Sequence, residues 1–184
     1  MIICLDPGHN YGLNGKGRDP GAINAELGLK ESVIALEIVK TLANMLIAKD
    51  HSIIFTRDNG DSELTLKKRC DIANQTRCDL FISIHLNSSD NTSANGIETL
   101  RFGSSSNEKL ANQVQKALIK WTKARDRGVK VRNDLYVLKY TRMPAILVEV
   151  GFISNKEEAL RLNDSEYQRK LCNAILEGLE GLDV

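Results

Sequence analysis

The sequence contains no long hydrophobic run and no strong excess of charge of either sign. No window approaches the roughly 18 to 20 apolar residues that a membrane-spanning helix needs, and no basic segment with a cleavage site opens the chain. The 25 lysines and arginines nearly balance 24 aspartates and glutamates, which leaves a formal net charge of +1. We therefore expect no membrane span, no export signal within this chain and no charge-driven binding of nucleic acid.

Cysteine is also scarce, and its spacing does not suggest cross-linking. Cys4, Cys70, Cys78 and Cys172 form no C-x-x-C pair and are far less dense than in a small disulfide-rich scaffold. We expect buried free thiols rather than a disulfide or a metal site. Internal repeats, low-complexity tracts and a proline-rich linker are absent too. The whole chain, residues 1–184, is predicted to form a single domain, with a monomer as the default state.

What the sequence does contain is an alternation of strand-length apolar runs and stretches of helical period. Expected strands are Ile2–Leu5, Ser52–Thr56, Leu80–His85, Gly96–Phe102 and Ala145–Val150. Expected helices are Lys30–Ala48, Leu64–Thr76, Asn107–Ala124 and Ser165–Leu182, and a basic loop and a short extended piece, Leu135–Leu138, precede the last strand. This alternation predicts an α/β sandwich with a mostly parallel central sheet. The irregular stretches are Gly8–Leu29 and Val129–Asn133, and the first is long enough to suggest a function.

Several titratable residues fall at the ends of the predicted strands. His9 follows the first strand, His85 closes the third, and Glu149 lies near the end of the last. Open α/β sheets bind ligands beyond the carboxyl ends of their strands, so these three side chains belong to one edge. Glu31 lies at the same edge, because the first helix begins where the glycine-rich loop comes back from the first strand. His51 precedes its strand and belongs to the opposite edge, as a solvated loop residue.

Two imidazoles and one carboxylate leave one corner of a tetrahedral zinc ion open, as catalytic sites do. Water at that corner has its pKa lowered toward about 7, and a second carboxylate can take its proton and pass it to a leaving amine. His9, Glu31 and His85 are therefore candidate ligands of one zinc ion, and Glu149 is the candidate base. Amide hydrolysis is the reaction that suits this set.

Each of these residues also has a purely structural interpretation. A histidine at a strand end often makes only a structural hydrogen bond, and a glutamate in a first helical turn often serves the helix dipole. Glu149 is harder to explain in this way, because it interrupts an apolar run where an unpaired carboxylate is costly to bury. Glu26 competes with Glu31, and spacing alone leaves that choice open. Asp6 and Asn87 could orient the histidine rings or satisfy nearby backbone at turns, and the structural role is slightly favoured.

The glycine-rich loop after the first strand invites a comparison with nucleotide sites. Its glycines do not form G-x-G-x-x-G, and Gly15-Lys16 is followed by glycine rather than by the serine or threonine of a P-loop. A nucleotide site is therefore weakly supported. The glycines more simply let the backbone turn or pass close to a metal or substrate.

The sequence resembles the zinc-dependent N-acetylmuramoyl-L-alanine amidases, which are bacterial and phage cell-wall hydrolases. The resemblance spans nearly the whole chain in the correct order, which makes it specific. It is carried by Asp6-Pro7-Gly8-His9, Arg18-Asp19-Pro20-Gly21-Ala22, Gly28-Leu29-Lys30-Glu31, Leu66-Lys67-Lys68-Arg69, Ile72-Ala73-Asn74, Ser83-Ile84-His85-Leu86-Asn87, Asn95-Gly96-Ile97-Glu98 and the run from Met143 to Asn155.

The resemblance implies zinc ligands at His9, Glu31 and His85 and a catalytic glutamate at Glu149, and it favours Glu31 over Glu26. It implies a single catalytic domain, 1–184, with a twisted sheet of about six strands flanked by helices on both faces. The implied reaction is cleavage of the amide between N-acetylmuramic acid and the L-alanine of the stem peptide, at the cell wall. Peptidoglycan is then the substrate, and we mark Asn87 as a candidate substrate-binding residue.

Two departures from the family pattern are visible. The loop Asn10–Arg18 is longer and more polar than the compact family form, and only Ser88–Ala94 stands where some relatives carry a helical insertion that blocks the site. We therefore expect a site that is not self-blocked. Two other hypotheses remain open: a peptidoglycan-binding domain without catalysis, and a related zinc peptidase acting on another amide. Bacterial, sporulation and phage origins are equally compatible with the sequence.

Overall fold

The computed structural model describes residues 1–10, 19–58 and 64–180 of the chain. Its centre is a six-stranded sheet in the order β4-β1-β5-β8-β6-β7. The strands are β1 (Ile2–Pro7), β4 (Ser52–Phe55), β5 (Leu80–Asn87), β6 (Ile97–Arg101), β7 (Asp126–Val131) and β8 (Ala145–Phe152). The pairs from β4 to β8 are parallel, β6 runs antiparallel to β8, and β7 is parallel to β6. The predicted α/β class with a mostly parallel sheet is thus confirmed.

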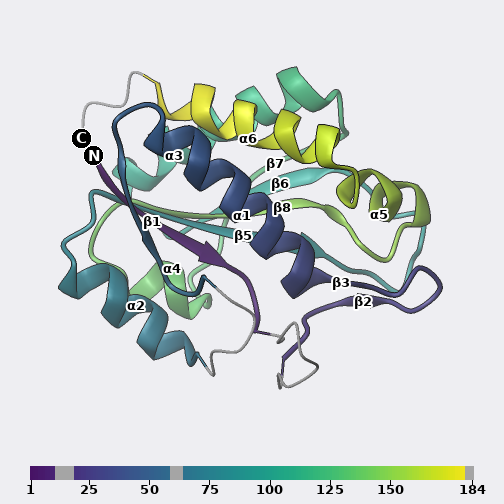
Figure 1. Cartoon of the computed structure of the whole chain (residues 1–184), viewed down its shortest axis with the longest axis horizontal. Helices are drawn as coiled ribbons and strands as arrows, with labels where there is room; N and C mark the ends of the chain where they lie inside the picture. The colour runs from purple at the N-terminus through teal and green to yellow at the C-terminus, as the bar shows by residue number, and fades with distance from the viewer. Residues whose placement is uncertain (11–18, 59–63, 181–184) are drawn as a thin grey trace.

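Helices cover both faces of this sheet, which gives three layers (Figure 1). One face carries α1 (Glu31–Ile47), α3 (Ser105–Thr122) and α6 (Ser165–Leu179), and the other carries α2 (Leu66–Gln75) and α4 (Tyr136–Tyr140). A short helix, α5 (Lys156–Leu162), follows β8, and a small hairpin of β2 (Ile23–Asn24) and β3 (Leu29–Lys30) precedes α1. Within the described part of the chain, none of the helices has the combination of length and hydropathy that a membrane span requires.

The core consists of two apolar clusters, one on each face of the sheet. In β1, Ile3 and Leu5 belong to the larger cluster under α1, α3 and α6, while Cys4 belongs to the smaller one under α2 and α4. This follows from the two-residue period of a strand, which sends successive side chains to opposite faces. All four cysteines are free and buried, as the sequence predicts.

Three parts of the sequence-based prediction were wrong. The basic loop before Leu135 contains strand β7, in which no residue is fully buried because it is the edge of the sheet. The predicted extended piece Leu135–Leu138 is mostly helical, because all of it except Leu135 lies in α4. This helix is too short to show a helical period, and it buries two adjacent residues, Val137 and Leu138. Helix α5 was not predicted, because seven residues span only about two turns.

The predicted irregular stretches differ in part as well. Gly8–Leu29 contains β2 and ends at β3, and Val129–Asn133 begins inside β7. The predicted long loop Asn10–Arg18 lies, apart from Asn10, outside the described residues. Residues 88–96, between β5 and β6, contain no helix. The edge of the sheet near His85 is therefore not covered by a helical insertion from this connection.

Candidate metal centre

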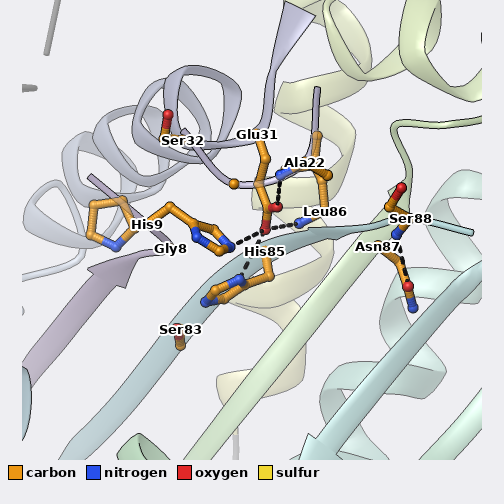
Figure 2. A network of polar contacts seen from close by, with 12 residues as sticks. Gly8, His9, Ala22, Glu31, Ser32, Ser83, His85, Leu86, Asn87 and Ser88 are labelled. Atoms are coloured by element: carbon orange, nitrogen blue, oxygen red, sulfur yellow. Dashed lines mark hydrogen bonds and ion pairs between the residues drawn. The ribbon is translucent and has the colours of Figure 1, made fainter. Parts of the chain in front are cut away.

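Three segments that are distant in sequence bring His9, Glu31 and His85 together. His9 follows β1, Glu31 is the first residue of α1, and His85 lies on β5. β1 and β5 are parallel neighbours with Pro7 opposite Ile84, so the two histidines reach the same edge. Their rings make a T-shaped contact with centroids 5.0 Å apart. The predicted grouping of these three residues is therefore present (Figure 2).

Glu31 is the centre of this group. Its Oε1 lies 2.9 Å from His85 Nδ1 and 3.2 Å from His9 Nε2, and it accepts a 3.0 Å hydrogen bond from the Leu86 amide. Its Oε2 accepts a 2.9 Å hydrogen bond from the Ala22 amide. Burial alone would raise the pKa of this carboxyl, but hydrogen bonds from His85 and His9 hold the pKa well below its ordinary value. Glu31 is therefore a fixed, ionised carboxylate.

Asp19 orients the first histidine, a contact that sequence reasoning missed. Both carboxylate oxygens of Asp19 lie 2.9 Å from His9 Nδ1, and Oδ1 also accepts a hydrogen bond from the Gly21 amide. Burial would lower the pKa of His9, but hydrogen bonds to Glu31 and Asp19 raise it to about 9. A carboxylate on Nδ1 leaves Nε2 directed at the centre, as for metal-binding histidines in general. The only sequence signal was the position of Asp19 in the Arg18 to Ala22 stretch.

The backbone around the centre leaves no room for additional side-chain atoms. A Cβ on Gly8 would lie 2.5 Å from the His85 ring, and a Cβ on Gly21 would lie 2.6 Å from Glu31 Oε2. Gly21 also has φ +69°, a left-handed conformation that favours glycine. His9 itself has φ 56°, which is uncommon for a residue with a Cβ. These two glycines therefore let the chain pass close to the histidine and glutamate side chains.

Glu149 lies beside this centre on the same face of the sheet. It pairs with His85 across the parallel β5–β8 ladder and with Glu98 across the antiparallel β6–β8 ladder. Its Oε2 is buried without a hydrogen-bond partner among the described residues. Burial raises the pKa of Glu149 to about 7; His85 opposes this rise, whereas Glu31 and Glu98 add to it. A carboxylate in this state can both take up and release a proton near neutral pH.

Asp6 and Asn87 do not contact the histidine rings through any recorded hydrogen bond in the described structure. Asp6 is buried and accepts hydrogen bonds from Thr56, Ser83 and Arg69, which fits the structural role. Asn87 donates to Glu98 over 3.2 Å and accepts from the amide of Ser88, and Figure 2 shows its side chain apart from the three central residues. Binding of substrate by Asn87 stays a prediction.

The two residues that competed for a place at the site lie elsewhere. Glu26 is an exposed residue that forms an ion pair with Lys156 of α5, so the geometry favours Glu31. His51 lies beside the amino terminus, 3.4 Å from the Met1 nitrogen, at the opposite edge of the sheet. Both positions agree with the sequence-based preference.

The donor set fits a small divalent cation. One ligand atom from each of His9, Glu31 and His85 lies within 4.8 Å of the others. Ligand atoms that share one tetrahedral zinc ion lie roughly 3.3 Å apart, so the contacts around Glu31 need only a small adjustment. Two neutral nitrogens and one carboxylate also match the ligand types that zinc prefers. The tight packing at Gly8 and Gly21 and the unpartnered oxygen of Glu149 are consistent with a cation at this position.

A cavity of about 450 Å³ opens beside the two histidines, between the sheet and the helices α2 and α4. His9, His85, Asp19 and Arg69 line it on the polar side. Its apolar lining consists of Leu64, Leu66, Leu135, Tyr136, Val137 and Leu147. A cavity of this size with an ionisable centre at its wall is the usual form of an enzyme's substrate site.

The fold and this site together define an α/β domain with a candidate metal centre beside a cavity. The chain belongs to the N-acetylmuramoyl-L-alanine amidase family, whose sequence model matches residues 3–181. It is 37% identical over 179 residues to the amidase LytC of Bacillus subtilis (strain 168), a match that covers 96% of this chain and 34% of LytC. It is 36% identical over 186 residues to the endolysin of Bacillus phage SPP1, covering 97% of this chain and 64% of the endolysin.

A solved structure agrees with these relatives. The crystal structure of an N-acetylmuramoyl-L-alanine amidase from Clostridium difficile 630 matches with a TM-score of 0.89 and 35% sequence identity, covering 97% of this chain and 94% of the other. The chain thus spans almost all of that structure but only about a third of LytC. The family predicted from the sequence is confirmed.

Proposed function

We propose that this chain hydrolyses the amide between the lactyl group of N-acetylmuramic acid and the L-alanine of the stem peptide in peptidoglycan. One zinc ion, held by His9, Glu31 and His85, would be its cofactor, and Glu149 its general base. Its place of action would be the cell wall. Family membership supports the reaction, and the convergence of the three side chains around Glu31 Oε1 is the observation that carries the metal assignment.

Each residue of the proposed site has a separate role in the reaction. When bound, zinc supplies Lewis acidity, which activates water and polarises an amide carbonyl. Asp19 keeps the His9 ring in the tautomer that presents Nε2. Glu149 takes a proton from the attacking water as the new C–O bond forms, and it delivers that proton to the nitrogen as the C–N bond breaks. The products are a lactyl carboxylate and a peptide with a free amino terminus.

The cavity beside the histidines would hold the substrate next to this machinery. Its apolar wall, which includes Leu135 and Leu147, suits the methyl groups that flank the scissile amide on the lactyl and alanyl sides. Residues 88–96 contain no helix that could cover the edge of the sheet. We therefore expect the domain to be active without a partner that uncovers the site.

Digestion of purified peptidoglycan with and without a chelator, followed by mass analysis of the fragments, tests this function. We expect free stem peptides that begin with L-alanine, and no release when zinc is removed. Release of peptides cut at another amide would favour a peptidase. Binding to the wall without any fragment would favour a non-catalytic domain.

A further inference from the structure

Two arginines outside the proposed ligand set hold the backbone that presents His9. Arg57 follows β4 and Arg69 lies in α2, and both are buried, with 2% and 3% of their surface exposed. Arg57 Nε donates to the Pro7 carbonyl over 3.1 Å, and Arg69 Nη1 donates to the same oxygen over 2.8 Å. The end of β1 is therefore held from two sides by side chains, in addition to the backbone hydrogen bond that the Gly8 amide donates to the Ile84 carbonyl.

The carbonyls of the turn after β1 are held in the same way. Arg57 Nη2 donates to the Gly8 carbonyl over 2.7 Å, and Arg69 Nη2 donates to the His9 carbonyl over 2.6 Å. Three consecutive carbonyl groups thus accept hydrogen bonds from the two guanidinium groups. Because His9 has φ 56°, its backbone needs such support to stay in a sparsely populated conformation.

Arg57 also reaches the segment that carries the second ligand. The same Nη2 atom that contacts Gly8 donates to the Ser32 carbonyl over 2.8 Å, and Ser32 directly follows Glu31. Within the described structure, Arg69 makes no hydrogen bond to the first turn of α1. It forms an ion pair with Asp6 instead, at 2.6 Å. One nitrogen of Arg57 therefore joins the His9 turn to the first turn of α1.

Burying the charged guanidinium group of Arg57 costs free energy, which a residue that only filled space would not require. No ion pair joins Arg57 to a carboxylate within the described part of the chain, and its Nη1 is buried without a recorded partner there. Burial and the neighbouring Arg69 lower the pKa of Arg57 to about 10, so the group is still charged at neutral pH. A buried charge needs compensating contacts, and here the backbone carbonyls on both sides of the site provide them.

We propose that Arg57 is a positioning residue for the metal centre, and that it sets the distance between His9 and Glu31 by tying Gly8 to Ser32. This inference rests on the proposed zinc site. It predicts that Arg57 changes the affinity for zinc without touching the ion. Supporting contacts behind metal ligands typically change the affinity by about 10- to 100-fold when they are removed.

The test measures zinc affinity by competition with a chromogenic chelator for the wild-type chain and for the variants R57M, R57K and R101M. Arg101 is a matched control, because it is also largely buried and donates to the backbone carbonyls of Phe102 and Ser104, at the end of β6 away from Glu98. Near-UV circular dichroism and thermal unfolding of each metal-free variant report its folding independently.

We expect R57M to bind zinc about 10- to 100-fold more weakly than the wild type. R57K should show an intermediate loss, because one ammonium group replaces fewer of the contacts, and R101M should stay within about two-fold even if its metal-free form unfolds earlier. A folded R57M with wild-type zinc affinity would overturn the proposal. If R57M does not fold, R57K decides, and unchanged affinity in R57K would overturn the proposal equally. Absence of zinc binding by the wild-type chain would instead refute the proposed function.

Discussion

At the scale of single residues, Glu149 is the side chain whose position is hardest to explain by stability. The carboxylate sits in an otherwise apolar strand, beside Glu98 on the next strand, with one oxygen unpartnered among the described residues. Such a group costs free energy in the folded chain unless a nearby cation compensates it. A cation held by the adjacent ligands would provide that compensation. The same feature gives Glu149 the proton affinity that a base at neutral pH needs.

The variant E149Q separates zinc binding from proton transfer. It keeps the three ligand side chains, so it should bind zinc like the wild type while kcat falls about 10²- to 10⁴-fold through loss of the general base. H85A removes a ligand and should lose both zinc and turnover. Metal analysis and peptide release measure the two properties separately, with E108Q on the exposed surface of α3 as a control. Undiminished activity of E149Q would remove Glu149 from the mechanism.

Glu149 should also make the stability of the metal-free chain depend on pH. Its pKa is raised from 4.5 to about 7, so the folded chain favours the protonated form and loses stability as the pH rises from 4.5 through about 7. In chelator at pH 8, E149Q should be more stable than the wild type by on the order of 3 kcal/mol, and at pH 4 the difference should vanish. Urea unfolding at the two pH values measures this; an equal difference at both would contradict the assignment.

Asp19 should matter for zinc affinity although it is not a proposed ligand. The substitution D19N replaces the carboxylate with a neutral amide and weakens the hydrogen bond to His9 Nδ1. Loss of such a contact typically lowers metal affinity by about 10- to 100-fold. D134N is a suitable control, because Asp134 is a similarly exposed aspartate paired with Arg132. Chelator competition gives both values. Equal affinities of D19N and D134N would show that Asp19 does not orient the ligand.

Residue types and strand ends were sufficient to predict that most of the candidate site residues lie close together. His9, His85 and Glu149 follow from the rule that parallel strands deliver their ends to one edge. The role of Asp19 could not be predicted in this way. Its contact with His9 depends on how a glycine-rich loop folds back, and the hydrophobic pattern of the sequence carries no information about that. The choice of Glu31 over Glu26 needed the family resemblance, since both glutamates lie in the return from the loop.

At the scale of helices and strands, long periodic segments were predictable and short ones were not. The helices α1, α3 and α6 and the buried strands lie within a few residues of their predicted bounds, because each shows a complete hydrophobic pattern. The exceptions are the edge strand β7, the two-residue strands β2 and β3, and the short helices α4 and α5. Their conformation depends on neighbours that are distant in sequence.

The crossing of α3 and α6 offers a prediction at this scale. A Cβ on Gly178 of α6 would lie 2.7 Å from the Cα atom of Val114 in α3, a backbone atom that cannot move aside. Alanine favours a helix over glycine by about 1 kcal/mol, but overpacking typically costs about 1–3 kcal/mol, so G178A should destabilise the chain. Urea unfolding measures the effect, with K170A on the exposed side of α6 as a control. A more stable G178A would contradict the close packing.

At the scale of the whole molecule, both helical layers pack on the same six strands. We expect residues 1–184 to unfold as one domain, so Trp121 fluorescence, which reports on the α3–α6 layer, should change together with far-UV circular dichroism. The two curves should coincide in chelator and shift together when zinc is added. Two separated transitions would show that the layers are independent.

The central claim is that His9, Glu31 and His85 share one zinc ion that the reaction requires. Stepwise addition of zinc to the metal-free chain, with release of L-alanyl peptides from peptidoglycan measured at each step, tests this claim most directly. Activity should rise in proportion to added zinc and stop rising at one equivalent per chain. Full activity of the metal-free chain, or a plateau at a different stoichiometry, would contradict the account.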